Sequence, residues 1–95
     1  MQVNVHYISL VKSYTNKSRE EITLNEGASM EQLLNQIANI YGKQFKEEVY
    51  DPEKKEMKST FVAMINGVLI DQLKGTSTPL KNGDNIILMA LMTGG

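Results

Sequence analysis

Residues 29–42 read SMEQLLNQIANIYG, and this segment predicts an amphipathic helix. Ser29 and Gln32 have the spacing of a capping box at its start, and Gly42 is placed to end it. The apolar residues follow i, i+3, i+4, i+7 spacing; they are Met30, Leu33, Leu34, Ile37, Ala38 and Tyr41. Because only one side of this helix is apolar, we expect it to lie across a sheet.

Strands are predicted on both sides of the helix. Residues 3–7 alternate between apolar and polar, which is typical of a strand with one wet face, and apolar residues extend it to Val11. A hairpin turn over residues 12–19 then leads to a short strand over 20–24. Asn25-Glu26-Gly27 ends that strand before the helix begins.

The second half of the chain predicts three more strands. Residues 61–65 and 86–92 are apolar on both faces, so we expect interior strands there. Asn66-Gly67 predicts a tight hairpin into a short strand over 68–70. This order favours an α+β roll, in which a mixed sheet of four or five strands carries one main helix on one face. A right-handed crossover would place the first and last strands parallel in the middle.

Length and composition indicate a single domain over residues 1–95. The net charge is -1, from ten basic and eleven acidic residues, so no basic excess suggests a nucleic acid or a membrane surface as partner. The chain has no cysteine, which excludes thiolate catalysis and disulfides within it. It shows neither a signal peptide nor a membrane-length apolar window, so we expect a cytoplasmic protein.

Motifs for catalysis are sparse. His6 is the sole histidine and has no acid or thiol near it in sequence, so we expect a solvated side chain rather than a base. No phosphate-binding loop and no carboxylate spacing of a metal site is present. We therefore expect a protein that is not an enzyme by itself and that binds no cofactor tightly.

The last strand carries more apolar surface than one helix can cover. If Ile86 and Leu88 point into the core, then Ile87, Met89 and Leu91 point away from the helix and form a candidate partner-binding surface. The alternative is that residues 43–59 fold back over this surface.

Residues 43–59 are the least regular part of the chain. Phe45, Val49 and Tyr50 could anchor a short turn of helix. We expect the charged cluster over 53–56 to be a solvated loop.

The chain closes with Met92-Thr93-Gly94-Gly95. Two glycines have no side chains to block a narrow channel, and the last residue offers a carboxylate as a reactive handle. We expect residues 93–95 to form a flexible reactive tail. The alternative is that two small residues simply fray at a terminus.

These segments together resemble the ubiquitin-like sulfur-carrier proteins, which include the small subunit of molybdopterin synthase and carriers of the thiamine and cysteine pathways. The resemblance covers most of the chain and is weakest over residues 43–59. The opening VNVHYI strand, the capped helix and FVAMINGVLI carry part of it. The ending carries most: Leu80, Gly83, Asp84, Gly94 and Gly95 match the family's Leu-x-x-Gly-Asp turn, apolar strand and Gly-Gly. The resemblance implies a ubiquitin-like β-grasp fold.

It also implies a function. A partner of the ubiquitin-activating type would use ATP to adenylate Gly95, and sulfur would then convert Gly95 to a thiocarboxylate. Gly94 would be a steric requirement. Ile87, Met89, Leu91, Met92 and Thr93 would contact the partners, which are the adenylating enzyme and a sulfur-accepting synthase subunit. Molybdopterin biosynthesis is the expected destination of the sulfur.

Other functions remain open from the sequence. The sulfur could serve thiamine or cysteine biosynthesis instead. The activated Gly95 could join a lysine of a target protein, as in ubiquitin-type modifiers. A plain interaction module with an incidental Gly-Gly is the third possibility.

Overall fold

The computed structural model describes residues 1–91. The first half of the chain holds two strands and three helices: β1 (Gln2–Ile8), α1 (Leu10–Thr15), β2 (Arg19–Thr23), α2 (Met30–Tyr41) and α3 (Lys43–Glu48). Strands and short turns follow: β3 (Tyr50–Asp51), β4 (Glu56–Met57), β5 (Phe61–Ile65), β6 (Val68–Leu69), the 3-10 turns η1 (Ile70–Gln72) and η2 (Gly75–Ser77), and β7 (Asn85–Ala90).

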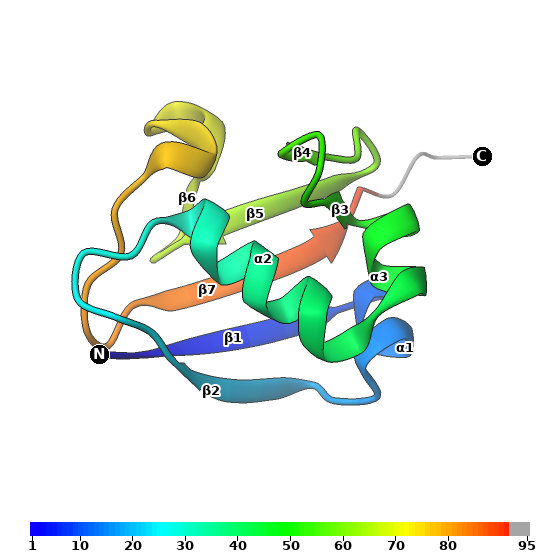
Figure 1. Cartoon of the computed structure of the whole chain (residues 1–95), viewed down its shortest axis with the longest axis horizontal. Helices are drawn as coiled ribbons and strands as arrows, with labels where there is room; N and C mark the ends of the chain where they lie inside the picture. The colour runs from blue at the N-terminus through cyan, green and yellow to red at the C-terminus, as the bar shows by residue number, and fades with distance from the viewer. Residues whose placement is uncertain (92–95) are drawn as a thin grey trace.

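A mixed five-stranded sheet forms the body of the molecule, in the order β2-β1-β7-β5-β6. β1 and β7 are parallel in its middle, and the other pairs are antiparallel. α2 lies across one face of this sheet (Figure 1). The expected β-grasp roll and its central parallel pair are therefore confirmed.

The capping box predicted for α2 is present in both directions. The Gln32 backbone N–H donates to Ser29 Oγ at 3.4 Å, and the Ser29 N–H donates to Gln32 Oε1 at 2.8 Å. Gly42 ends the helix with a φ of 82°, a left-handed value that glycine adopts without steric cost. The predicted stripe is buried at Met30, Leu33, Leu34, Ile37 and Ala38, where it packs on the inward side chains of the sheet.

The first predicted hairpin was wrong in detail. β1 ends at Ile8, and Leu10 begins α1, a short helix where we expected strand and then a turn. Val11 and Thr15 are buried while Ser13 between them is exposed. A strand would place all three on one face, so this pattern fits a helix and not a longer strand. Asn16 ends the helix with a φ of 59°.

Residues 43–59 fold onto the core, and they contain the short helix that Phe45, Val49 and Tyr50 were expected to anchor. α3 follows α2 directly, and Phe45, Val49 and Tyr50 are fully buried in the core cluster. β3 and β4 pair as a small hairpin, and its charged tip over residues 53–56 is exposed as expected. Figure 1 shows α3 at the carboxyl end of α2, on the helix-bearing side of the sheet.

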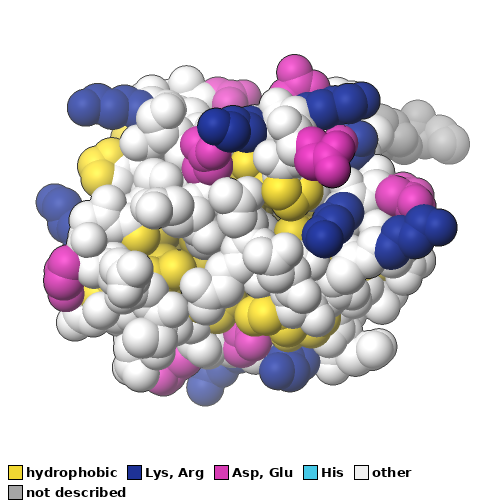
Figure 2. All heavy atoms as spheres, in the orientation of Figure 1, with side chains coloured by type: hydrophobic (Ala, Val, Ile, Leu, Met, Phe, Trp, Pro, Cys, Tyr) yellow, Lys and Arg dark blue, Asp and Glu magenta, His cyan; other side chains and the backbone are white. Residues whose placement is uncertain are grey.

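The helix-bearing side has little continuous apolar surface. Figure 2 shows this side, where hydrophobic side chains emerge in small areas separated by polar and charged ones. Within residues 1–91, no helix is both long and apolar enough to cross a membrane.

Candidate functional site

The final strand β7 presents different side chains to its two sides. Ile86 and Leu88 are fully buried beneath α2, whereas Ile87 and Met89 are partly exposed. Neighbouring side chains of a strand point to opposite faces. Ile87 and Met89 therefore lie on the face away from α2, which we call the outer face.

The neighbouring strands continue this apolar surface. In register, Ile87 lies opposite Met64 of β5, and Met89 lies opposite Val62; both β5 residues are partly exposed. On the other side, Met89 lies opposite Ile8 of β1, whose exposed fraction is 39%. The outer face therefore carries a continuous apolar stripe across β1, β7 and β5.

Leu91 is the last residue that the structure describes. Its backbone N–H donates to the carbonyl oxygen of Thr60 at 2.7 Å, which extends the β5–β7 pairing by one residue. Its side chain is 49% exposed and borders a groove that is also lined by Met57, Val62 and Leu69. The main chain is therefore hydrogen-bonded to the sheet as far as Leu91. The apolar side chain of Leu91 is exposed directly before the tail.

The Leu-x-x-Gly-Asp segment fixes the start of β7. Leu80 is buried, and Gly83 has a φ of 87°, so a side chain there would be strained. The carboxylate of Asp84 accepts from the Lys81 N–H at 2.8 Å and from Asn66 Nδ2 at 3.0 Å. Asn66 Oδ1 in turn accepts from the Asn85 N–H at 2.9 Å. These hydrogen bonds therefore hold the β5–β6 hairpin against the start of β7.

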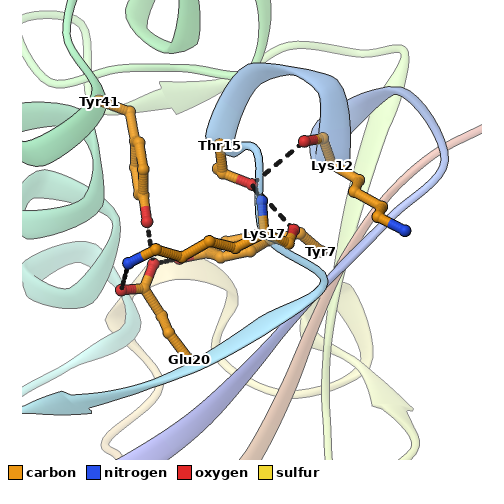
Figure 3. Close-up of polar contacts among 6 residues, drawn as sticks. All are labelled: Tyr7, Lys12, Thr15, Lys17, Glu20 and Tyr41. Atoms are coloured by element: carbon orange, nitrogen blue, oxygen red, sulfur yellow. Dashed lines mark hydrogen bonds and ion pairs between the residues drawn. The ribbon is translucent and has the colours of Figure 1, made fainter.

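A polar cluster inside the fold was not expected from the sequence. Figure 3 shows Tyr7, Tyr41 and Lys17 converging on the carboxylate of Glu20. Tyr7 donates to Glu20 Oε2 at 2.6 Å, Tyr41 donates to the same oxygen, and Lys17 Nζ lies 3.5 Å from Glu20 Oε1. The cluster joins β1, β2 and the end of α2. Because its residues are far apart in the chain, no local pattern in the sequence indicates it.

Burial and hydrogen bonding set the charges of this cluster. Burial by itself raises the pKa of Glu20, but hydrogen bonds from Tyr41 and Tyr7 and the charge of Lys17 lower that pKa below its ordinary value overall. Burial and the Glu20 carboxylate raise the pKa of Tyr41 to about 12 and raise the pKa of Tyr7 further. Glu20 therefore stays ionised and both phenols stay neutral near pH 7.

The structure brings only some of the predicted site residues together. Ile87 and Met89 are both partly exposed on the outer face of β7, and Leu91 follows the strand with its side chain exposed. Their contact with a partner stays a prediction. Met92, Thr93, Gly94 and Gly95 lie outside the described residues. Among residues 1–91, no group of three or more histidine, aspartate or glutamate side chains is arranged to hold a metal ion.

Comparison with known proteins gives a family match. A sequence model of the ThiS family matches residues 3–95. No curated protein sequence matches the chain.

Several solved structures share the fold. A putative molybdopterin converting factor, subunit 1, from Pyrococcus furiosus is 26% identical, with a TM-score of 0.77 and coverage of 96% of this chain and 98% of that chain. SAMP1 from Haloferax volcanii is 12% identical, with a TM-score of 0.82 and both chains covered completely. A chain of the BexX/CysO complex from Amycolatopsis orientalis is 14% identical, with a TM-score of 0.74 and coverage of 98% and 99%.

Proposed function

This chain belongs to the ThiS family of ubiquitin-like sulfur carriers, and we propose that its Gly95 carries sulfur as a thiocarboxylate. The observation that carries the proposal is the family match over residues 3–95, which includes the Gly-Gly ending. The strand leading to that ending is anchored up to Leu91 and has an apolar outer face.

The chemistry needs an activating step because a carboxylate is a poor acyl donor. In the proposed reaction, the Gly95 carboxylate attacks the α-phosphorus of ATP, releasing pyrophosphate and forming an acyl-adenylate. Hydrosulfide then attacks the acyl carbon and expels AMP, which leaves a thiocarboxylate. If the sulfur comes from a persulfide, an acyl disulfide forms first and a thiol must cleave it. The chain has no cysteine, so the sulfur is brought by another protein or by free sulfide.

The proposed partner-binding residues are those on the outer face and in the tail. Ile87, Met89 and Leu91 would contact the adenylating enzyme, and Met92 and Thr93 would follow Leu91 into its channel. Gly94 would leave room for the backbone beside the reacting carbonyl. The BexX/CysO complex supports the idea that proteins of this fold work with a partner protein.

The proposed destination of the sulfur is molybdopterin. The support is the 26% identity to the putative molybdopterin converting factor subunit from Pyrococcus furiosus. A thiamine-pathway or cysteine-pathway acceptor is the competing destination within the same chemistry.

The test is a reconstituted activation. The full chain is incubated with the adenylating enzyme of its own organism, ATP and sulfide, and the intact mass is measured. We expect a gain equal to the difference between sulfur and oxygen, and no gain when Gly95 is deleted. If adenylation occurs but Gly95 ends on lysines of other proteins and never on sulfur, a protein modifier replaces the sulfur carrier. If no adenylating enzyme activates the chain, both are wrong.

The destination is tested separately. Thiocarboxylated chain is mixed with a molybdopterin-synthase large subunit, a thiazole synthase or a cysteine synthase from the same organism. Consumption of the thiocarboxylate by the first alone supports molybdopterin.

A further inference from the structure

A hollow of about 430 Å³ lies on the outer face where β1 ends and α1 begins. Ile8 and Ile87 form its apolar wall, and His6, Ser9 and Lys12 form much of its polar wall. Ile87 also belongs to the apolar stripe described above, so the hollow opens directly beside the proposed partner-binding surface.

The hollow has a positive side without a negative partner. Lys12 is exposed, and none of the ion pairs found among residues 1–91 involves it. Figure 3 shows its side chain extending away from Glu20. On the sheet, His6 lies opposite the exposed Arg19.

The nearby acids are placed elsewhere. Glu20 is engaged by two tyrosines and Lys17. Glu48 lies near Tyr14, whose pKa is raised by burial and by the charge of Glu48. Glu21 lies on β2 opposite Asn4, one strand further from the hollow. No aspartate or glutamate lines the hollow. A negative group could therefore enter it without meeting a like charge in its wall.

The backbone at the hollow is strained. Ser9 has a φ of 57° and a ψ of -132°, and its side chain makes no capping hydrogen bond with α1. A residue with a side chain rarely adopts this conformation, and strained residues of this kind cluster at ligand-binding and switch segments.

The hollow also lies at the tail's end of the sheet. β1 and β7 are parallel, and Ile8 is in register with Met89, so Ser9 follows β1 at the same end at which Leu91 follows β7. A partner that covers the outer face and takes hold of the chain beyond Leu91 must pass close to Lys12.

We propose that this hollow receives an aspartate or glutamate side chain of the adenylating enzyme, placed between Lys12 and His6. The acidic group would fix the orientation of the partner on the apolar stripe, because pairs of opposite charge set the register of an interface, whereas apolar contacts alone are not directional. This inference rests on the proposed function, and it adds the chemical identity of one partner residue.

The test compares two charge reversals of equal size. Lys12→Glu changes the hollow, and Lys74→Glu changes an exposed lysine between η1 and η2. Figure 1 shows the segment over residues 70–77, in yellow to orange, on the other side of the molecule from α1. The association rate with the adenylating enzyme that activates the wild type is measured at low and high salt. Thermal unfolding of both variants checks that they fold.

We expect Lys12→Glu to slow association by roughly tenfold or more at low salt, with the difference shrinking as salt rises. Lys74→Glu should stay near the wild-type rate. A lysine in place of the matching acid on the enzyme should restore the rate with Lys12→Glu. Equal slowing by both variants would mean a general charge effect and would overturn the proposal, as would no slowing by either. A wild-type chain that no such enzyme activates overturns the proposed function, and this inference with it.

Discussion

The hydroxyl of Tyr7 on β1 donates a 2.6 Å hydrogen bond to the carboxylate of Glu20 on β2. Tyr41 at the end of α2 donates to the same oxygen, and the rings of the two tyrosines meet edge to face at 6.1 Å between centroids. One carboxylate therefore joins the edge strand, a central strand and the main helix.

This arrangement predicts acid sensitivity. The pKa of Glu20 is lowered in the folded protein from an ordinary value of 4.5. A lowered carboxyl pKa contributes stability that is present above the unfolded pKa and is lost as the pH falls through the folded pKa. We expect Glu20→Gln to lower the free energy of unfolding at pH 7 by about 1–3 kcal/mol. The variant should also lose less stability than the wild type below pH of about 4.5.

Urea unfolding between neutral and acid pH measures both effects. Glu21→Gln is the matched control, because Glu21 is exposed on the adjacent position of β2. Equal behaviour of the two variants would show that the Glu20 hydrogen bonds add nothing to stability.

The core prediction concerns Leu34, which is fully buried on the side of α2 that packs against the core. Leu34→Ala removes buried apolar volume, so we expect the free energy of unfolding to fall by ~2–5 kcal/mol. Ile40 lies on the same helix with 53% of its surface exposed, and Ile40→Ala should change stability far less. An unchanged urea midpoint for Leu34→Ala would refute the packing of α2 described here.

Much of this fold could be predicted from local sequence. Three of its features depend on only a few neighbouring residues, so they can be predicted without knowledge of the tertiary structure. They are the apolar period of residues 29–42, the Ser29–Gln32 cap and the Asn66-Gly67 turn. The alternation along β7 was also predictable, but the side that faces α2 is set by tertiary packing, which buries Ile86 and Leu88.

The rest depended on contacts between distant residues. α1 has only six residues, too few for periodicity to separate a helix from an extension of β1. The Glu20 cluster joins residues 13 and 21 positions apart in the chain, and no spacing rule indicates such a pairing. β3 and β4 have two residues each, and their pairing follows from the burial of Tyr50 next to α2.

The strained backbone of Ser9 predicts that one substitution there raises the free energy of unfolding, whereas most substitutions lower it. Glycine adopts a positive φ readily, so Ser9→Gly should relieve about 1–3 kcal/mol of strain, less about 0.5–1 kcal/mol for the added freedom of the unfolded chain. We expect a net gain in stability in thermal or urea unfolding. Ser13→Gly, inside α1, should instead destabilise. A loss of stability in both variants would show that Ser9 is not strained.

The outer face predicts a separation of binding from folding. Met89 is partly exposed on the side away from α2, so Met89→Asp should weaken association with the adenylating enzyme while changing the urea midpoint little. Leu73→Asp is the control, because Leu73 is 43% exposed and follows η1, outside the apolar stripe. Unfolding of Met89→Asp would place Met89 in the core and would contradict the assigned face.

The tail makes the sharpest prediction of the proposed function. Gly94 precedes the reacting residue, and any side chain there would widen the chain beside the acyl carbon. We expect Gly94→Val to reduce adenylation of Gly95 by at least about 100-fold, in line with the cost of misplacing reacting groups. The free energy of unfolding should stay at the wild-type value, because the described core ends before this residue.

ATP–pyrophosphate exchange with the adenylating enzyme measures the first step alone, and intact mass measures the thiocarboxylate. Gly27→Val is the control, since Gly27 has a φ of 82° in the turn between β2 and α2, outside the tail; it should destabilise the fold but leave adenylation of the folded fraction intact. Normal exchange by Gly94→Val would mean that the enzyme does not enclose the tail in a narrow channel.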